Sequence, residues 1–180
     1  INADDYARVR YSNGKTMEEI ALLREGRTAE LCDLVVHPRN REDVQAIVRY
    51  AHEQKIPVYV FGGGSSVTLG LRPSKGGITL VMSTHMKRIT EFNETNQTVT
   101  AESGIMGPDL EEALRKAPLL YNAKHLFTCG HFPQSFEFST LGGWIIAKGS
   151  GQQSSYYGDA CDLVISQEYV TPAGSFKTLD

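Results

Sequence analysis

The chain has 180 residues, and 18 Lys and Arg against 21 Asp and Glu give it a formal net charge of -3. With 41% hydrophobic and 22% charged residues, the composition is that of a globular domain, which excludes collagen, coiled coil and intrinsic disorder. Because the balance is slightly acidic and the sequence has no runs of Lys or Arg, nucleic acid is not expected as a partner.

Targeting and cysteine signals are few. No apolar run is long enough for a membrane span, and residues 1–10 lack the apolar core of a signal peptide. The chain begins with Ile1, which indicates a processed product or a fragment. Cys32, Cys129 and Cys161 are odd in number and far apart, so neither a disulfide framework nor a metal site is predicted, and a reducing, intracellular compartment is expected.

The first clear elements form a strand, helix and strand. Residues 34–36 and 58–61 are short apolar runs typical of buried strands. Between them, Asn40 is placed to cap a helix. The apolar face of this helix recurs at helical spacing and comprises Val44, Ile47, Val48 and Ala51. This order predicts parallel strands joined by a right-handed crossover.

The rest of the chain predicts a strand over 78–82, then a hairpin of 86–92 and 97–102. A helix is expected from Gly107 to Pro118, with Pro108 in its first turn and Pro118 as its end. Residues 121–157 look irregular apart from 141–147. Strands are predicted at 163–166 and 168–171, and Phe176 restarts a strand. The pattern indicates an α+β fold with a small parallel βαβ lobe and a more antiparallel second lobe.

A glycine-rich loop, Gly62-Gly63-Gly64-Ser65-Ser66, directly follows the second apolar strand. Glycines permit positive φ and close approach to a ligand, and consecutive N–H groups with two hydroxyls can converge on phosphate oxygens. A diphosphate is the favoured ligand, but a plain tight turn would use the same triplet. A dinucleotide fingerprint is excluded because Val67 replaces its third glycine, and Gly14-Lys15-Thr16 lacks the earlier glycine of a P-loop.

A second region, residues 133–144, combines hydroxyls, a glycine pair and aromatic side chains. A planar heteroaromatic ring needs close backbone, polar edge contacts and apolar walls, which such a segment can supply. Taken singly, Phe136, Phe138 and Trp144 are equally what a hydrophobic core uses. Residues 147–150 form a third small and polar segment just beyond.

Other reactive side chains have simpler interpretations. His125 and His131 flank the second region. Cys129 is either a reactive thiol, acting as a nucleophile or as a thioether to a flavin, or a small buried thiol, and the second interpretation is favoured. Glu137 is either an acid beside the ring or a carboxylate that accepts from loop N–H groups, and again the second is favoured. No catalytic residue is assigned.

Four segments, taken in order, carry a resemblance to a known family: residues 22–27, 62–66, 136–144 and 157–159. Together they resemble the FAD-binding (PCMH-type) domain of the vanillyl-alcohol-oxidase flavoprotein superfamily, and within it the alkyldihydroxyacetonephosphate synthases. The resemblance implies a two-lobed PCMH-type FAD-binding domain over 31–180, truncated at its C-terminus. Its lobes are expected at about 31–106 and 107–180, with residues 1–30 as an N-terminal extension packed on the domain.

The cofactor implied by the resemblance is FAD. Relatives with a covalent flavin often carry His directly after the glycines, where this chain has Ser65 and Ser66, so binding is expected to be non-covalent. The residues expected to bind FAD by this resemblance are Val60, Phe61, Gly62, Gly63, Gly64, Ser65, Ser66, Gln134, Ser135, Phe136, Glu137, Phe138, Ser139, Thr140, Gly142, Gly143, Ala147, Lys148, Gly149 and Ser150. The catalytic residues of the family would lie beyond Asp180, so the fragment alone is expected to be inactive.

The resemblance implies the FAD-binding portion of an alkylglycerone-phosphate synthase-like flavoenzyme of ether-lipid synthesis, which exchanges acyl for alkyl on dihydroxyacetone phosphate. The alternatives are an FAD-dependent 2-hydroxy-acid dehydrogenase or oxidase and a non-catalytic nucleotide-binding module. The expected partner is a small-molecule substrate held by a missing C-terminal domain. A homodimer, and membrane-surface association of the full-length protein, are compatible with the resemblance. The expected location is cytoplasmic in a bacterium and peroxisomal in a eukaryote.

Overall fold

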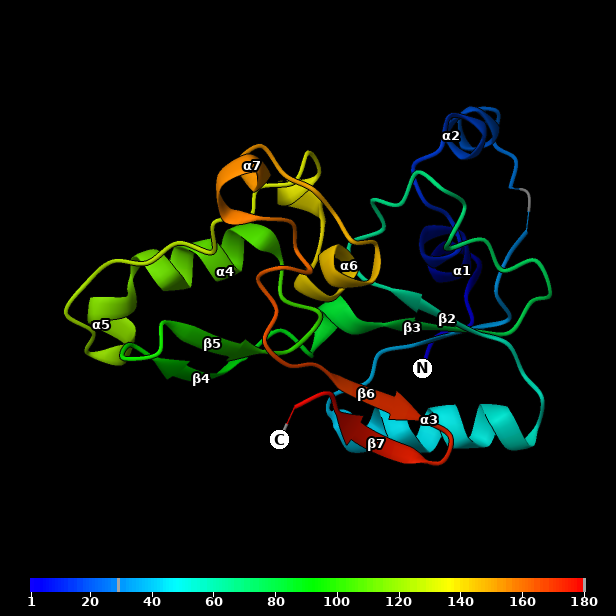
Figure 1. The fold of residues 1–180 in the computed structure, drawn as a ribbon. Helices are drawn as coiled ribbons and strands as arrows, with labels where there is room; N and C mark the ends of the chain where they lie inside the picture. The colour runs from blue at the N-terminus through cyan, green and yellow to red at the C-terminus, as the bar shows by residue number, and fades with distance from the viewer. Residues whose placement is uncertain (29, 180) are drawn as a thin grey trace.

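A three-stranded parallel sheet forms the centre of the molecule in the computed structural model, which describes residues 1–28 and 30–179 (Figure 1). The strand order is β1-β3-β2, with β1 at Leu34–Val36, β3 at Ile78–Val81 and β2 at Val58–Phe61. The predicted parallel pairing is confirmed, but β3 lies between the two strands that were expected to form the crossover unit. The fold is thus mixed, with this parallel sheet and two antiparallel hairpins.

Helix α3 (Arg41–Glu53) covers one face of this sheet (Figure 1). The helix begins where Asn40 accepts a hydrogen bond from the Asp43 N–H at 2.8 Å, as the sequence predicted. Its buried Ala51 packs with Val36 and Leu80 of the sheet. The contact between α3 and the sheet is thus an apolar core, which stabilises this lobe.

The opposite face is covered by α1 (Asp5–Tyr11), whereas α2 (Met17–Arg24) lies beyond α1, farther from the sheet (Figure 1). Ala7 of α1 packs in a cluster with Val35 and Phe61. The Arg8 side chain donates through Nε to the Cys32 carbonyl at 2.8 Å, which fixes α1 to the chain just before β1. The first residues are therefore an integral layer over the sheet.

A second core lies beside the sheet. It is built from the hairpin of β4 (Ile89–Asn93) and β5 (Thr98–Ala101), with α4 (Gly107–Arg115) and α6 (Leu141–Ile146). Helix α5 (Ala117–Tyr121) joins it through Tyr121, which stacks on Phe92. Its fully buried members are Ile105, Leu110, Leu114, Trp144 and Ala160. The hairpin therefore shares this core with the helices that follow it, and the predicted division of the lobes at about residue 106 stays a prediction.

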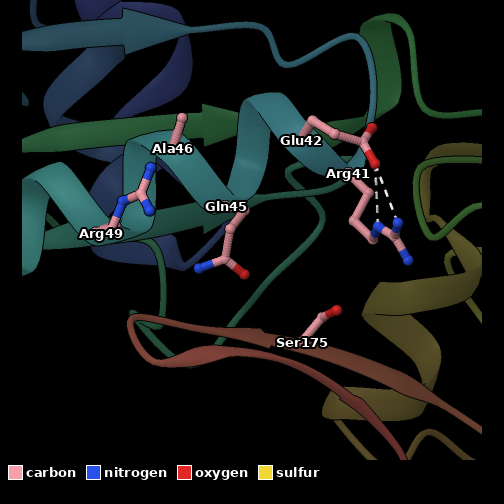
Figure 2. A pocket seen from close by; sticks show the side chains of 6 residues that line it. All are labelled: Arg41, Glu42, Gln45, Ala46, Arg49 and Ser175. Atoms are coloured by element: carbon pink, nitrogen blue, oxygen red, sulfur yellow. Dashed lines mark hydrogen bonds and ion pairs between the residues drawn. The ribbon is translucent and has the colours of Figure 1, made fainter.

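The C-terminal hairpin returns to the first lobe. Strands β6 (Glu168–Thr171) and β7 (Gly174–Lys177) lie against α3 (Figure 1). Gln45 donates to the Thr171 carbonyl at 2.7 Å, and Arg41 pairs with Glu168 at 3.1 Å. Figure 2 shows the shallow hollow between α3 and this hairpin.

Two details of the sequence prediction are wrong. Residues 163–166 form no strand, because Leu163 and Ile165 are exposed and no strand within the described part of the chain pairs with them. Pro118 does not simply end a helix: α4 stops at Arg115, and Pro118 lies in the first turn of α5, a position that proline tolerates well. The remaining short elements are the 3-10 turns Met82–Thr84 and Phe136–Phe138 and helix α7 (Ser154–Tyr157).

No helix in residues 1–28 or 30–179 is both long and apolar enough to cross a membrane.

Candidate cofactor site

The glycine loop after β2 lies directly against the start of α6. Atoms placed as Cβ on Gly62 or Gly63 would overlap the Thr140 hydroxyl or the Phe138 carbonyl oxygen, so only glycine allows this approach. Thr140 is 1% exposed and caps α6 by accepting from the Gly143 N–H at 3.3 Å. The first two predicted segments therefore meet in one place, at the junction of the two lobes.

The backbone of the loop presents its N–H groups without acceptors. The Gly62 carbonyl accepts from the Ser83 hydroxyl at 2.8 Å, and the Ser66 carbonyl accepts from the Lys15 N–H at 2.7 Å. By contrast, the four N–H groups of residues 63–66 donate to no acceptor among residues 1–28 and 30–179. Gly64 has φ +74°, the left-handed conformation that makes successive N–H groups converge. Such a run is suited to an anion.

A pocket of about 300 Å³ opens beside this loop. Its lining comes from the end of β2 and from three distant segments: Arg10, Tyr11, Lys15, Phe61, Gly62, Gly63, Ser83 and Met106. The lining holds two cations and no carboxylate. Arg10, Tyr11, Ser83 and Met106 were not predicted as site residues, and Lys15 stands out in the sequence only as part of an incomplete P-loop motif.

Residues 134–138 lie next to the loop but outside the lining of this pocket. Gln134 and Glu137 are exposed, and Phe138 is 67% exposed. The Ser135 carbonyl accepts from the Ser139 hydroxyl at 2.7 Å, so these two residues close a short turn. Their predicted contact with a cofactor stays a prediction.

Trp144 belongs to the second core rather than to a ligand wall. Its side chain is 4% exposed, and its Nε1–H donates to the Ser139 hydroxyl at 2.6 Å. Phe136 stacks on it with ring centroids 5.9 Å apart. Core packing is therefore the correct interpretation for Trp144, and through Ser139 this core positions the turn that contacts the glycine loop.

Residues 147–150 follow the other end of α6. Ala147 and Lys148 are exposed, and the Gly149 N–H donates to the Trp144 carbonyl at 2.9 Å. Val60 also points away: it is 60% exposed and alternates with Phe61, so its side chain lies on the α3 face of the sheet. Neither Val60 nor this segment lines the pocket, and their contact with a cofactor stays a prediction.

The environment of Cys129 disfavours a role as nucleophile. Burial raises the pKa of its thiol to about 11, so the thiolate is scarce at neutral pH. The Cys129 N–H donates to Glu111, a buried carboxylate that also accepts from Thr128 and Arg115. The structure thus favours a structural thiol. Within the described residues, no three His, Cys, Asp or Glu side chains gather as metal ligands would.

His131 places a polar ring in the interior of the protein. It is 2% exposed, and neither ring nitrogen has a hydrogen-bond partner among the described residues. Its ring packs edge-on against Trp144 at 5.2 Å between centroids. Burial lowers the pKa of His131, and the nearby Asp159 opposes this only in part. Burying an unpaired polar ring costs stability.

Replacing His131 with phenylalanine is expected to raise the free energy of unfolding by roughly 1 kcal/mol at neutral pH, since an unpaired polar ring becomes apolar. The gain should grow below about pH 6.5. Below that pH, His131 binds a proton in the unfolded chain more readily than in the folded protein. The protein with His131 therefore loses stability as the pH falls. Urea unfolding at about pH 7.5 and about pH 5 measures both effects. The pKa of His37 is also lowered by burial, but this residue is present in both proteins and so contributes equally to their pH dependence. Equal pH dependence of the two proteins would contradict the prediction.

Comparisons with known proteins agree with this geometry. Residues 32–180 match the model of a family described as FAD binding domain. The chain is 34% identical over 98% of its length to the alkyldihydroxyacetonephosphate synthase of Dictyostelium discoideum, and 31% identical over 79% to the glycolate oxidase subunit GlcD of Bacillus subtilis. It covers 28% of each of these relatives.

A solved alkyldihydroxyacetonephosphate synthase superposes on 99% of the chain with a TM-score of 0.89 and 32% identity, and the chain covers 31% of that structure. The expected two-lobed, PCMH-type architecture and the expected cofactor class are thereby confirmed. This chain belongs to the FAD binding domain family.

Proposed function

We propose that the chain binds FAD with the diphosphate against residues 62–66, while residues 134–143 and 147–150 border the rest of the cofactor. The observation that carries this proposal is the run of N–H groups in residues 63–66, which have no acceptor within the described residues and adjoin a cationic pocket. Backbone N–H groups arranged in this way stabilise phosphate oxygens without any specific side chain. When bound, FAD supplies the electron-accepting ring that amino-acid side chains lack.

Non-covalent binding is part of this proposal. The lining of the pocket contains neither His nor Cys, the residues that most readily bond to a flavin ring. Ser65 and Ser66 follow the glycines, and the thiol of Cys129 is disfavoured as a thiolate by burial. Denaturation should therefore release all flavin from the protein.

For the whole protein that contains this chain, we propose an alkylglycerone-phosphate synthase-like activity, in which an acyl group on dihydroxyacetone phosphate is exchanged for an alkyl group. Support comes from identity to a synthase over 98% of the chain, a span longer than residues 32–180 that match the family model. The substrate, a small molecule, would be bound by parts of the protein outside this chain. A homodimer, association with a membrane surface and an intracellular location remain proposals, the last consistent with three free thiols.

The second candidate is an FAD-dependent 2-hydroxy-acid oxidoreductase. It is favoured by the 31% identity to a glycolate oxidase subunit, although this covers less of the chain than the synthase match does. Both candidates need the same diphosphate cradle, so residues 62–66 do not separate them.

A two-part experiment on the purified whole protein tests these proposals. A visible absorption band near about 450 nm is expected, and its recovery in the supernatant after denaturation tests non-covalent binding. With acyl-dihydroxyacetone phosphate and a fatty alcohol, alkyl product should form. Bleaching of the flavin by D-lactate or glycolate, without alkyl product, would establish the second candidate instead. A protein that binds ADP as well as FAD and ignores both substrates would be a nucleotide-binding module.

A further inference from the structure

We infer that Arg10 and Lys15 bind the diphosphate of FAD from the side facing the glycine loop, an inference that rests on the proposed function. Both side chains line the pocket beside Gly62 and Gly63. Both also precede residue 32, where the match to the family model begins. The matched domain would then supply the backbone N–H groups of the phosphate site, and the N-terminal segment would supply its two cations.

The segment that carries Lys15 is held against the glycine loop by its backbone. The Lys15 N–H donates to the Ser66 carbonyl at 2.7 Å. A Cβ placed on Gly14 would lie 2.5 Å from the same carbonyl oxygen, so a glycine is needed for so close an approach. Lys15 is consequently fixed at its Cα, while its exposed side chain is free to reach a ligand.

Glu19 keeps this segment in place. The buried carboxylate accepts from the Gly14 N–H at 2.8 Å and from the N–H and hydroxyl of Thr16 at 3.0 and 2.8 Å. Burial opposes ionisation, but these hydrogen bonds outweigh it and hold the pKa of Glu19 below its usual range. The charge of Lys15 also lowers this pKa, but the ammonium group forms no close ion pair with Glu19 in the described residues and instead donates to the Gly14 carbonyl at 3.3 Å.

Arg10 reaches the pocket through an aromatic support. Its guanidinium carbon lies 5.3 Å from the centre of the Tyr11 ring, and Tyr11 packs edge-on against Phe61 at 5.1 Å. Phe61 immediately precedes the glycine loop. This stack orients the guanidinium at the pocket while leaving its N–H donors for a bidentate acceptor such as phosphate.

Neither of these two cations is engaged in a close ion pair within the described residues. Within the described part of the chain, neither cation lies within 4.0 Å of a carboxylate, whereas Arg8, Arg72 and Arg88 are each paired. The pocket lining contributes no acid either. Two cations beside a row of N–H donors match a ligand with about two negative charges, which is the charge of a dinucleotide diphosphate.

The test uses the whole protein freed of flavin, with Arg10→Gln, Lys15→Gln and the double variant, since glutamine keeps the side-chain length and removes the charge. Dissociation constants for FAD and for riboflavin, which has no phosphate, are measured by flavin fluorescence at low and high salt. Each single variant should bind FAD roughly tenfold more weakly, and the double variant more weakly still. Riboflavin binding should stay unchanged, and the salt dependence of FAD binding should shrink.

Arg49→Gln is the matched control. Arg49 is an exposed arginine of α3 that borders the hollow in Figure 2, and it too has no carboxylate within 4.0 Å in the described residues. It should bind FAD like the native protein. Arg10→Lys combined with Lys15→Arg should restore most of the affinity, because it keeps both charges.

Three results would overturn the inference. If the double variant binds FAD within about twofold of native protein, the two cations do not contact the diphosphate, and the proposed function stands. If the double variant instead loses only affinity for inorganic phosphate or dihydroxyacetone phosphate, the cations serve the substrate. If native protein binds no FAD, the proposed function fails first, and this inference falls with it.

Discussion

Replacing Gly63 with alanine is expected to abolish measurable FAD binding and to lower the free energy of unfolding by roughly 2–4 kcal/mol. The added methyl group would overlap the Phe138 carbonyl oxygen and lie 2.9 Å from the Ser139 Cα. Both neighbours are backbone atoms, so no side-chain rotation relieves the overlap. The loop and the turn before α6 must separate, and the N–H groups of residues 63–66 lose their common orientation.

The matched control for this change is Gly70→Ala. Gly70 lies in the same connection between β2 and β3, where an added Cβ would meet only the Ser66 hydroxyl at 3.6 Å and the Thr68 hydroxyl at 3.8 Å. These are ordinary contacts, so stability and FAD affinity should stay close to native values. Thermal unfolding followed by circular dichroism, together with flavin titration, measures both quantities. If Gly63→Ala behaves like Gly70→Ala, close contact between the two loops is not required.

Local signals explain which elements could be predicted from the sequence. Asn40 caps α3 through a hydrogen bond to a residue only three positions away. The glycine triplet directly follows an apolar run, so the end of β2 and the start of a loop are both visible in the local sequence. The placement of β3 between β1 and β2 could not be predicted, because strand order depends on contacts between distant segments. The same reason explains residues 163–166, where an apolar pattern exists but no neighbouring strand pairs with it in the described residues.

The candidate site shows the same division. The glycine loop and the turn at Ser139 were predicted as one site, and the structure brings them together. The cations of the pocket were not found, because Arg10 and Lys15 reach it through the packing of α1 and a hydrogen bond to the Ser66 carbonyl. The only sequence signal was the conjunction of Gly14 and Lys15, which serves here to bring two backbones close rather than to form a P-loop.

Trp144 connects the second core to the site, so its loss should have the largest effect on stability. Trp144→Ala is expected to cost about 3–5 kcal/mol, since a large buried ring leaves a cavity among Ile105, Leu110 and Ala160. It also removes the donor to the Ser139 hydroxyl, which in turn donates to the Ser135 carbonyl. FAD affinity should fall as well, because Ser139 and the preceding carbonyl lie against the glycine loop.

Trp144→Phe separates the two contributions of this side chain. It retains one six-membered ring of apolar contact and removes the rest of the indole together with its N–H, so a loss of about 1–2 kcal/mol is expected. Ser139→Ala leaves the indole N–H buried without its acceptor and should cost a similar amount, whereas the double change should cost less than the sum because neither partner is then left unpaired. Urea unfolding of the four proteins gives the coupling energy. Strict additivity would mean that the 2.6 Å hydrogen bond does not join the core to the turn, and the site would then depend on Trp144 only through its volume.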